Sequence, residues 1–354
     1  MSEYPMEQKL IRWIEDHYTQ AKHNLSSSGL EEPDFGILGI NTSLEDMKKD
    51  HIDPKSFIKE RLCKLYGFPE ENIFLTTGGS ESISLLSMVA QAKHLPVFIG
   101  QPEYEPIFNV PQNMGLDTVL APFQNIEEKM AARSGLKAFF FSNPNNPTGN
   151  LHDPEFLKGI RERQFRKGGF MYADEAFLEF TFRKRPNSFY ENSPEIIING
   201  SMTKFYGFSG LRVGWIVAPP EIVRVLRDLR NITGIRNPEF PLWIAGQFLD
   251  RRDWFTKRAR SILEPNLEYL RSYMKGHGDL QWEEPRSGSY CLVRYSYDIS
   301  SEEFCQGALE KEKILICPGD YFGAGKSFRL CFTEQPQKFR ETLDALDSYL
   351  KTLH

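Results

Sequence analysis

The sequence has few cysteines and no long apolar run. Its five cysteines are scattered, odd in number and contain no Cys-x-x-Cys pair, which argues against a disulfide framework and against a zinc site. Reduced thiols of a cytosolic protein are the simpler interpretation. No apolar stretch approaches the roughly 20 residues of a membrane-spanning helix, and the charged residues between Met1 and Gln20 do not fit a signal peptide. We therefore expect a soluble, cytoplasmic protein with no membrane partner.

The chain also lacks an excess of positive charge. Its 43 Lys and Arg residues against 48 Asp and Glu residues give a formal net charge of −5, whereas nucleic-acid binding usually needs a basic face. We therefore expect no nucleic-acid partner. At 354 residues the chain exceeds what one hydrophobic core normally serves, so two packed domains are expected.

The central region alternates short apolar strands with helical segments. The expected strands are 73–76, 96–99, 138–142, 170–173, 196–199 and 213–217, and the expected helices are 56–66, 81–92 and most of 220–275. Strands that are apolar almost throughout are typical of a sheet buried on both faces. We predict an α/β fold whose large domain, residues 41–250, has a mainly parallel central sheet covered by helices.

The C-terminal part has a different pattern. Expected strands at 290–294, 314–316 and 328–332 alternate with helices at 301–312 and 336–353. Another helix, with one apolar face, is expected over 6–21. We predict that residues 1–40 and 251–354 together form a smaller α+β domain.

The strongest chemical signal surrounds Lys204. Residues 201–215, Ser-Met-Thr-Lys-Phe-Tyr-Gly-Phe-Ser-Gly-Leu-Arg-Val-Gly-Trp, connect two expected strands. A lysine at a strand exit can form an imine with an aldehyde if its surroundings lower its pKa. Ser201 and Arg212 add a hydroxyl donor and a permanent positive charge, which suit a phosphate monoester. A lone lysine is usually a solvated surface charge, but this combination has no evident packing purpose.

Two further segments follow expected strands. Asp174 begins Asp-Glu-Ala, and a buried carboxylate is costly unless it meets a cation such as a protonated pyridine nitrogen. Capping of a turn is the alternative role. Residues 142–149, Ser-Asn-Pro-Asn-Asn-Pro-Thr-Gly, predict a rigid turn because they contain two X-Pro bonds and a glycine. Amides held in this turn could bind an oxygen of a ligand ring.

Four more residues carry weaker signals. Gly79 and Ser80 lie in a strand-to-helix turn, where free backbone N–H groups attract phosphate, although many such turns contain glycine. Tyr104 offers a ring for stacking, but an aromatic residue more often packs in a core. Arg329 lies inside an apolar strand and needs a partner. A structural salt bridge and a substrate carboxylate are equally compatible with that position.

In combination these motifs resemble those of the fold type I enzymes that depend on pyridoxal 5′-phosphate (PLP), the class I and II aminotransferases. The resemblance runs from about residue 40 to about residue 335. It implies a PLP-binding large domain and an internal aldimine on Lys204, which also moves the substrate proton. The other implied roles are Asp174 on the pyridine nitrogen, Asn146 on the 3′-oxygen, Tyr104 on the ring face, Gly79, Ser80, Ser201 and Arg212 on the phosphate, and Arg329 on the substrate α-carboxylate. A homodimer with active sites at the subunit boundary is also implied.

Two positions depart from the family pattern. Phe177 stands where the family usually has a tyrosine that donates to the 3′-oxygen, so we expect a less acidic internal aldimine than is usual. His51 stands where relatives often have a tyrosine that reaches the partner subunit's phosphate. Whether His51 replaces that tyrosine is left open.

The substrate class depends on a third segment. Residues 203–206 and Phe177 resemble the branch of histidinol-phosphate aminotransferase and threonine-phosphate decarboxylase, which commonly has an arginine after the strand that matches 314–316. Here Cys317 begins Cys-Pro-Gly-Asp-Tyr-Phe-Gly, which is more similar to aspartate- and alanine-type aminotransferases. Without a bidentate contact, phosphate recognition would be weak. We therefore rank amino transfer between an amino acid and a 2-oxo acid above a reaction of a phosphorylated substrate.

A PLP-binding module without catalysis is the third hypothesis. Such regulators usually carry a DNA-binding domain, for which this chain leaves no room. All the core catalytic residues of the resemblance are also present, so we expect an enzyme.

Overall fold

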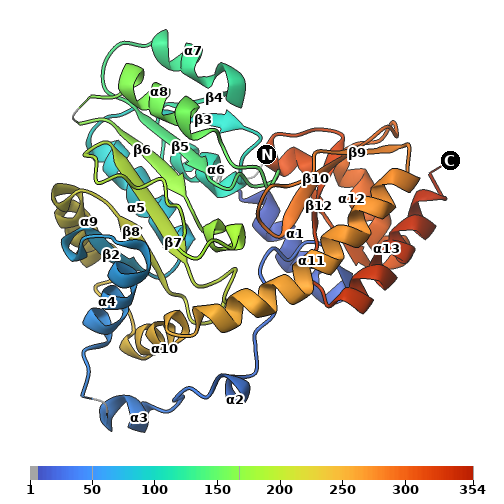
Figure 1. The fold of residues 1–354 in the computed structure, drawn as a ribbon. Coiled ribbons are helices and arrows are strands. Elements are labelled where there is room, and N and C mark those ends of the chain that lie inside the picture. The colour runs from blue at the N-terminus through green and yellow to red at the C-terminus, as the bar shows by residue number, and fades with distance from the viewer. Residues whose placement is uncertain (1–6, 50, 167, 354) are drawn as a thin grey trace.

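A computed structural model describes residues 7–49, 51–166 and 168–353 (Figure 1). Its larger sheet has seven strands in the order β2-β8-β7-β6-β5-β3-β4. They are β2 (Ile73–Thr76), β3 (Val97–Gln101), β4 (Thr118–Pro122), β5 (Ala138–Ser142), β6 (Phe170–Asp174), β7 (Ile196–Ser201) and β8 (Gly214–Val217). Strands β3 to β7 pair in parallel, whereas β8 is antiparallel to both of its neighbours. The predicted α/β fold with a mainly parallel central sheet is therefore confirmed.

Helices cover both faces of this sheet because alternate strand residues point to opposite sides. In β5, Phe139 and Phe141 belong to one buried cluster and Phe140 to the other. The first cluster includes residues of α4 (Pro54–Tyr66), α7 (Ile126–Ala131), α8 (Pro154–Gln164) and α10 (Glu239–Leu249). The second includes residues of α5 (Gly79–Ala92), α6 (Glu105–Asn113) and α9 (Pro220–Thr233). Strands packed on both faces explain the nearly continuous apolar runs of the sequence.

The C-terminal part contains a four-stranded antiparallel sheet in the order β12-β13-β10-β9. Its strands are β9 (Leu280–Trp282), β10 (Tyr290–Tyr295), β12 (Cys317–Pro318) and β13 (Ser327–Cys331), with α12 (Ser301–Glu312) and α13 (Pro336–Leu350) nearby. In Figure 1 the long α11 (Arg252–Gly276) runs from the region of α10 to this smaller sheet. The division into domains at residues 40 and 250 stays a prediction.

The N-terminal segment reaches both parts of the molecule. Helix α1 (Lys9–His17) contacts the smaller part, and β1 (His23–Asn24) pairs in parallel with β11 (Ile314–Leu315). Helices α2 (Phe35–Leu38) and α3 (Leu44–Lys49) lie in an arm beside α10, to which Arg251 fastens it by donating to Leu38 O at 2.7 Å. This segment therefore crosses the space between the two sheets.

Several predicted elements differ in extent. The strand expected at 314–316 is observed as β11 over two residues, and the next strand, β12, begins at Cys317 and belongs to a different sheet. The helix expected over 6–21 covers Lys9–His17 and continues as a short 3-10 turn, Tyr18–Gln20, while residue 6 lies outside the described residues. Strands β4 and β9 were not predicted, since β4 is a half-buried edge strand and β9 has only three residues. Among the described helices, none is long and apolar enough to cross a membrane.

Candidate active site

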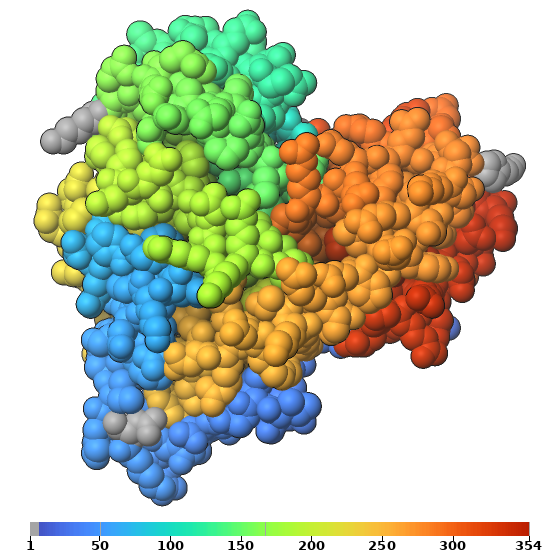
Figure 2. Space-filling model, viewed as in Figure 1, coloured from blue at the N-terminus to red at the C-terminus, as the bar shows by residue number. Residues whose placement is uncertain are grey.

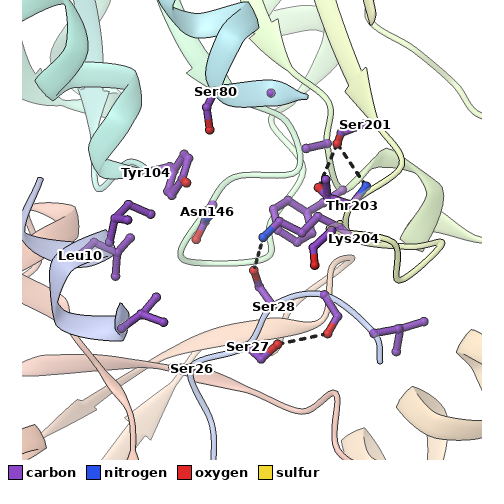
Figure 3. Close-up of a pocket in the computed structure, with 18 of the residues that line it drawn as sticks. Leu10, Ser26, Ser27, Ser28, Ser80, Tyr104, Asn146, Ser201, Thr203 and Lys204 are labelled. Carbon is purple, nitrogen blue, oxygen red and sulfur yellow. Dashed lines mark hydrogen bonds between the residues drawn. The ribbon is translucent and has the colours of Figure 1, made fainter. Parts of the chain in front are cut away.

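A cavity of about 320 Å³ lies at the carboxyl ends of β5, β6 and β7, where ligands of parallel sheets commonly bind (Figure 3). The candidate residues that line it are Gly79, Ser80, Tyr104, Asn146, Asp174, Ser201, Lys204, Arg212 and Arg329. All nine residues singled out from the sequence therefore meet at one site. His51 is exposed and does not line this cavity.

Lys204 enters the cavity from the segment that follows β7. Its Nζ donates to Ser28 Oγ at 3.1 Å (Figure 3), and no acidic side chain within the described ranges forms an ion pair with it. Burial, together with the nearby Arg329, lowers the pKa of Lys204 to about 8. About a tenth of the amine is therefore neutral at pH 7, and a nucleophile or proton acceptor must be in this neutral form.

Asp174 ends β6 and points its carboxylate into the same cavity. Oδ1 accepts the backbone N–H of Ala176 at 3.0 Å. Burial raises the pKa of Asp174, although the hydrogen bonds from Ala176 and Asn199 oppose this rise. No described lysine or arginine forms an ion pair with the carboxylate, so a cationic ligand group would relieve its desolvation.

A second part of the cavity is suited to an anion. Helix α5 begins at Gly79, which lines the cavity. No side chain caps this helix, so backbone N–H groups of its first turn are available to bind an anion. Arg212 is exposed, and a Cβ added at Gly78, where φ is +114°, would lie 2.8 Å from its Nη2. Only glycine therefore allows this approach. Ser201 Oγ lies 2.9 Å from Thr203 Oγ1 and adds a hydroxyl to the group.

Arg329 is 2% exposed and has no ion-pair partner among the described acidic residues. Nη1 donates to Asn146 Oδ1 at 3.1 Å, and Nη2 donates to Ser26 O at 2.8 Å. The structural salt bridge that the sequence left possible is thus not found in the described part of the chain. Because a buried charge needs a counter-charge, the guanidinium is placed to bind a ligand carboxylate.

Glu103 does not line the cavity but holds residues that do. It was not recognised in the sequence. Its carboxylate accepts the backbone N–H groups of Ser142 at 2.8 Å and Tyr104 at 2.7 Å, and also the Ser142 hydroxyl. Ser142 Oγ in turn accepts the N–H of Asn146 at 2.8 Å. Glu103 therefore fixes the backbone at Tyr104 and Asn146, and burial raises its pKa to about 8.

We expect the unfolding temperature of the wild type, relative to that of Glu103→Gln, to fall as the pH rises from 4.5 to about 8. The folded state holds a proton on Glu103 up to about pH 8, whereas the ordinary pKa of this side chain is 4.5. Folding therefore takes up a proton between these pH values, so wild-type stability falls as pH rises through this range. Glutamine has no such proton, and thermal unfolding at several pH values measures the difference. A constant difference, or the same trend in the exposed control Glu128→Gln, would contradict this explanation.

Two parts of the cavity wall had no signal in the sequence. The segment that follows β1 supplies Ser26, Ser27 and Ser28, and the apolar face of α1 supplies Leu10 and neighbouring residues. Periodicity marks a helix as amphipathic but does not show whether its apolar face meets a core or a cavity. Serines in a loop likewise carry no indication of their partners.

Phe177 lines the cavity, and Cys317 lies beside it in contact with Arg329. The Phe177 ring centroid is 5.7 Å from Lys204 Nζ, and the ring packs edge to face on Tyr290 at 4.7 Å. Cys317 is buried, and its Sγ accepts from Arg329 Nη2 at 3.5 Å. Neither side chain adds a charge to the cavity at neutral pH, since burial raises the pKa of Cys317.

Comparison with known proteins gives a consistent result. A family model described as aminotransferase class I and II matches residues 49–346. The chain is 23% identical to capreomycidine synthase of Streptomyces vinaceus, over 96% of this chain and 92% of that protein. It is 26% identical to histidinol-phosphate aminotransferase of Moorella thermoacetica, over 75% of this chain and 69% of that protein.

Solved structures share the fold. A PLP-dependent aminotransferase from Streptococcus suis has a TM-score of 0.84 at 24% identity, over 98% of this chain and 97% of that chain. The PLP-dependent cyclase OrfR has a TM-score of 0.85 at 24% identity, over 99% of this chain and 100% of that chain. Identities this low indicate a common architecture and leave the reaction to be argued from the site.

Proposed function

The chain belongs to the class I and II aminotransferase family, and from this membership we propose that it moves an amino group between an amino acid and a 2-oxo acid. PLP is the cofactor of the family, as the resemblance predicted. The observation that carries the proposal is the meeting of three groups in one cavity. They are the amine of Lys204, the unpaired carboxylate of Asp174 and the unpaired guanidinium of Arg329.

The cavity has the donors and charges that PLP requires. The buried carboxylate of Asp174 lacks a cation, which a protonated pyridine nitrogen would provide. The N-terminus of α5 and the exposed Arg212 lie together where glycine leaves room, and with Ser201 they would hold the phosphate. We assign Asn146 to the 3′-oxygen and Tyr104 to the ring face.

Bound PLP withdraws electrons from the substrate Cα and so allows one of the Cα bonds to break. Lys204 Nζ, with its pKa lowered to about 8, can accept the proton that leaves the substrate Cα and later donate it again. Ser28 Oγ accepts from this Nζ and so orients the amine within the cavity. Arg329 binds the α-carboxylate, and Asn146 and Ser26 hold its guanidinium in place.

The experiment is to incubate the PLP-loaded protein with single amino acids and to measure pyridoxamine phosphate and the matching 2-oxo acid. Amino transfer predicts both products in equal amounts. Carbon dioxide release without pyridoxamine phosphate would refute the proposal and favour decarboxylation.

Similarity to capreomycidine synthase over 96% of the chain favours a second candidate, a PLP-dependent reaction other than amino transfer. Mass spectrometry of the same mixtures separates the two. A new amino-acid product with no pyridoxamine phosphate would support the second candidate. A phosphorylated substrate, as in histidinol-phosphate aminotransferase, is less favoured because Cys317 leaves no cation at that position.

We expect Phe177→Tyr to lower the pH at which the visible absorbance of bound PLP changes. A phenol at this position would donate a hydrogen bond to the ring oxygen and favour its deprotonated form. The spectrum of PLP-loaded wild type and variant, recorded across pH, measures the shift. Phe180→Tyr serves as the control, because Phe180 is buried outside the cavity. Equal midpoints in wild type and Phe177→Tyr would contradict this expectation.

We also propose a homodimer that uses the N-terminal arm. Ile37 and Leu44 are 67% and 56% exposed on this arm, and Ile52 is 42% exposed just after it. Figure 2 shows the arm (blue) projecting from the body of the molecule. Several exposed large apolar side chains on one projecting segment favour an interface.

Leu44→Asp is therefore expected to shift the mass in solution from two chains toward one. Sedimentation equilibrium measures the mass. Leu136→Asp, at a site 45% exposed and far from the arm in sequence, is the control and should leave the mass unchanged. A wild-type protein with the mass of one chain at all concentrations would contradict the dimer.

A further inference from the structure

One face of α1 forms an apolar wall of the cavity. Leu10, Ile11, Ile14 and Tyr18 line it, and their spacing of three or four residues places them on the same side of the helix. Leu10 is buried, Ile11 and Ile14 are half-buried, and Tyr18 is exposed at the rim. In Figure 3 the helix carrying Leu10 faces Lys204 across the cavity. This wall is an apolar surface that the site offers to a ligand.

Trp13, on a neighbouring face of α1, fixes the helix to the smaller part of the molecule. Trp13 Nε1 donates to Ile316 O at 2.9 Å, and its ring meets Tyr321 edge to face at 6.3 Å. These contacts prevent rotation of the helix about its axis. The apolar wall therefore has a defined orientation.

The start of α1 is held by a carboxylate from a different helix. Helix α1 has no side-chain cap of its own. Instead, Glu105 accepts the N–H of Lys9 at 2.9 Å on Oε1 and the N–H of Leu10 at 2.6 Å on Oε2. A carboxylate at a helix N-terminus satisfies two unpaired donors and complements the helix dipole. Glu105 is only 3% exposed and directly follows Tyr104, so it links the wall to the residue assigned to the PLP ring.

The charges of the cavity restrict the substrate side chain. Among the described residues that line it, the only cations are Lys204, Arg212 and Arg329. The proposed function uses all three, for the amine chemistry, the PLP phosphate and the substrate α-carboxylate. Within one chain, no described cation of the cavity is left for a second anionic group of the substrate.

The polar groups near the wall are also occupied. Ser26 Oγ donates to Asn24 Oδ1 at 2.7 Å, and Ser28 Oγ accepts from Lys204. An adjoining hollow contains two lysines and three glutamates, Lys22, Lys338, Glu31, Glu32 and Glu334. Lys338 pairs with Glu334 at 3.3 Å, so this hollow offers no net positive charge to a phosphate.

We propose that the substrate is an amino acid with an apolar side chain, which packs against Leu10, Ile11 and Ile14, and that Glu105 is the positioning residue that holds this wall. The proposal rests on the proposed function and specifies its substrate class. Burial of apolar surface supplies the binding energy, and the absence of a free cation among the described lining residues of this chain disfavours acidic side chains.

The first test measures amino-acid binding through the change in the visible spectrum of PLP-loaded protein. We expect L-leucine to bind at least about tenfold more tightly than L-aspartate or L-arginine. Ile14→Lys should reverse the order of leucine and aspartate, whereas Thr19→Lys, an exposed neighbour outside the cavity, should preserve it. If aspartate or arginine binds the wild type as tightly as leucine, this inference is wrong while the proposed function stands. If no amino acid changes the spectrum, both fail.

The second test addresses Glu105. In Glu105→Ala we expect faster hydrogen exchange at the amides of Lys9 and Leu10 and a rise of about tenfold in KM for leucine, with kcat changed less than about twofold. PLP affinity should stay at the wild-type value. Glu105→Gln keeps the shape of the side chain and one acceptor oxygen, so its hydrogen exchange and its KM should lie between those of Glu105→Ala and the wild type. If Glu105→Ala does not fold, Glu105→Gln replaces it in this test. Glu128→Gln, exposed on α7, is the control.

A purely structural role for Glu105 predicts a different outcome. PLP affinity, kcat and KM would then worsen together as the fold weakens. Unchanged exchange and an unchanged KM in both Glu105 variants would likewise overturn the positioning role.

Discussion

Lys204→Ala is expected to lower kcat/KM for amino transfer by at least about 10⁴-fold. The variant loses the amine that bonds the cofactor and also the group that accepts and returns the substrate proton. Its neighbours cannot replace it, because Ser28, the partner of Nζ, has a hydroxyl of ordinarily high pKa. The remaining activity should reflect binding and orientation alone.

Borohydride treatment followed by mass spectrometry provides a readout independent of activity. In the wild type, the mass of reduced PLP should appear on the peptide that contains Lys204, and in Lys204→Ala it should be absent from every peptide. Lys129→Ala, an exposed lysine on α7, is the matched control and should retain both label and activity. Label on another lysine of the wild type would refute the assignment.

The sequence was sufficient to predict most strands of the larger sheet and to single out nine candidate residues that line one cavity, because both follow from local patterns. Strands such as β5 and β6 are apolar throughout, as burial on both faces requires. Most candidate motifs lie directly after a strand or at the start of a helix, and the carboxyl ends of parallel strands meet at one edge. Arg329 is different, because it lies inside β13 of the smaller sheet. The motifs therefore converge once the sheet is correct, as Asp174 and Ser201 do at the ends of β6 and β7.

The sequence did not show which distant segments complete the cavity. Ser28 lies 176 positions before Lys204, and Ser26 lies 303 positions before Arg329. Glu105 acts on a helix start 95 or more positions earlier. These contacts depend on how the N-terminal segment passes between the two sheets, which no periodicity or turn motif encodes. Short elements such as β9 were missed for a related reason, since three residues carry too little pattern.

Arg329→Leu is expected to raise KM for the amino acid by about 100-fold or more without lowering the unfolding temperature of the ligand-free protein. The guanidinium is buried, and no carboxylate of the described residues pairs with it, so its charge is costly in the absence of substrate. The substituted leucine side chain removes this cost but also loses the hydrogen bonds to Asn146 and Ser26. These two effects on stability roughly offset each other. A residue with a structural salt bridge would instead lose stability when replaced.

The pairing of the two measurements decides between these roles for Arg329. Steady-state kinetics gives KM, and thermal unfolding without amino acid gives stability. The KM of Arg329→Lys should lie between those of the wild type and Arg329→Leu, because lysine keeps the charge but not the bidentate geometry. Arg294→Leu, at an exposed position of the adjacent strand β10, should leave KM unchanged. A strong loss of stability in Arg329→Leu with little change in KM would assign Arg329 to the fold, and the substrate carboxylate would then need another partner.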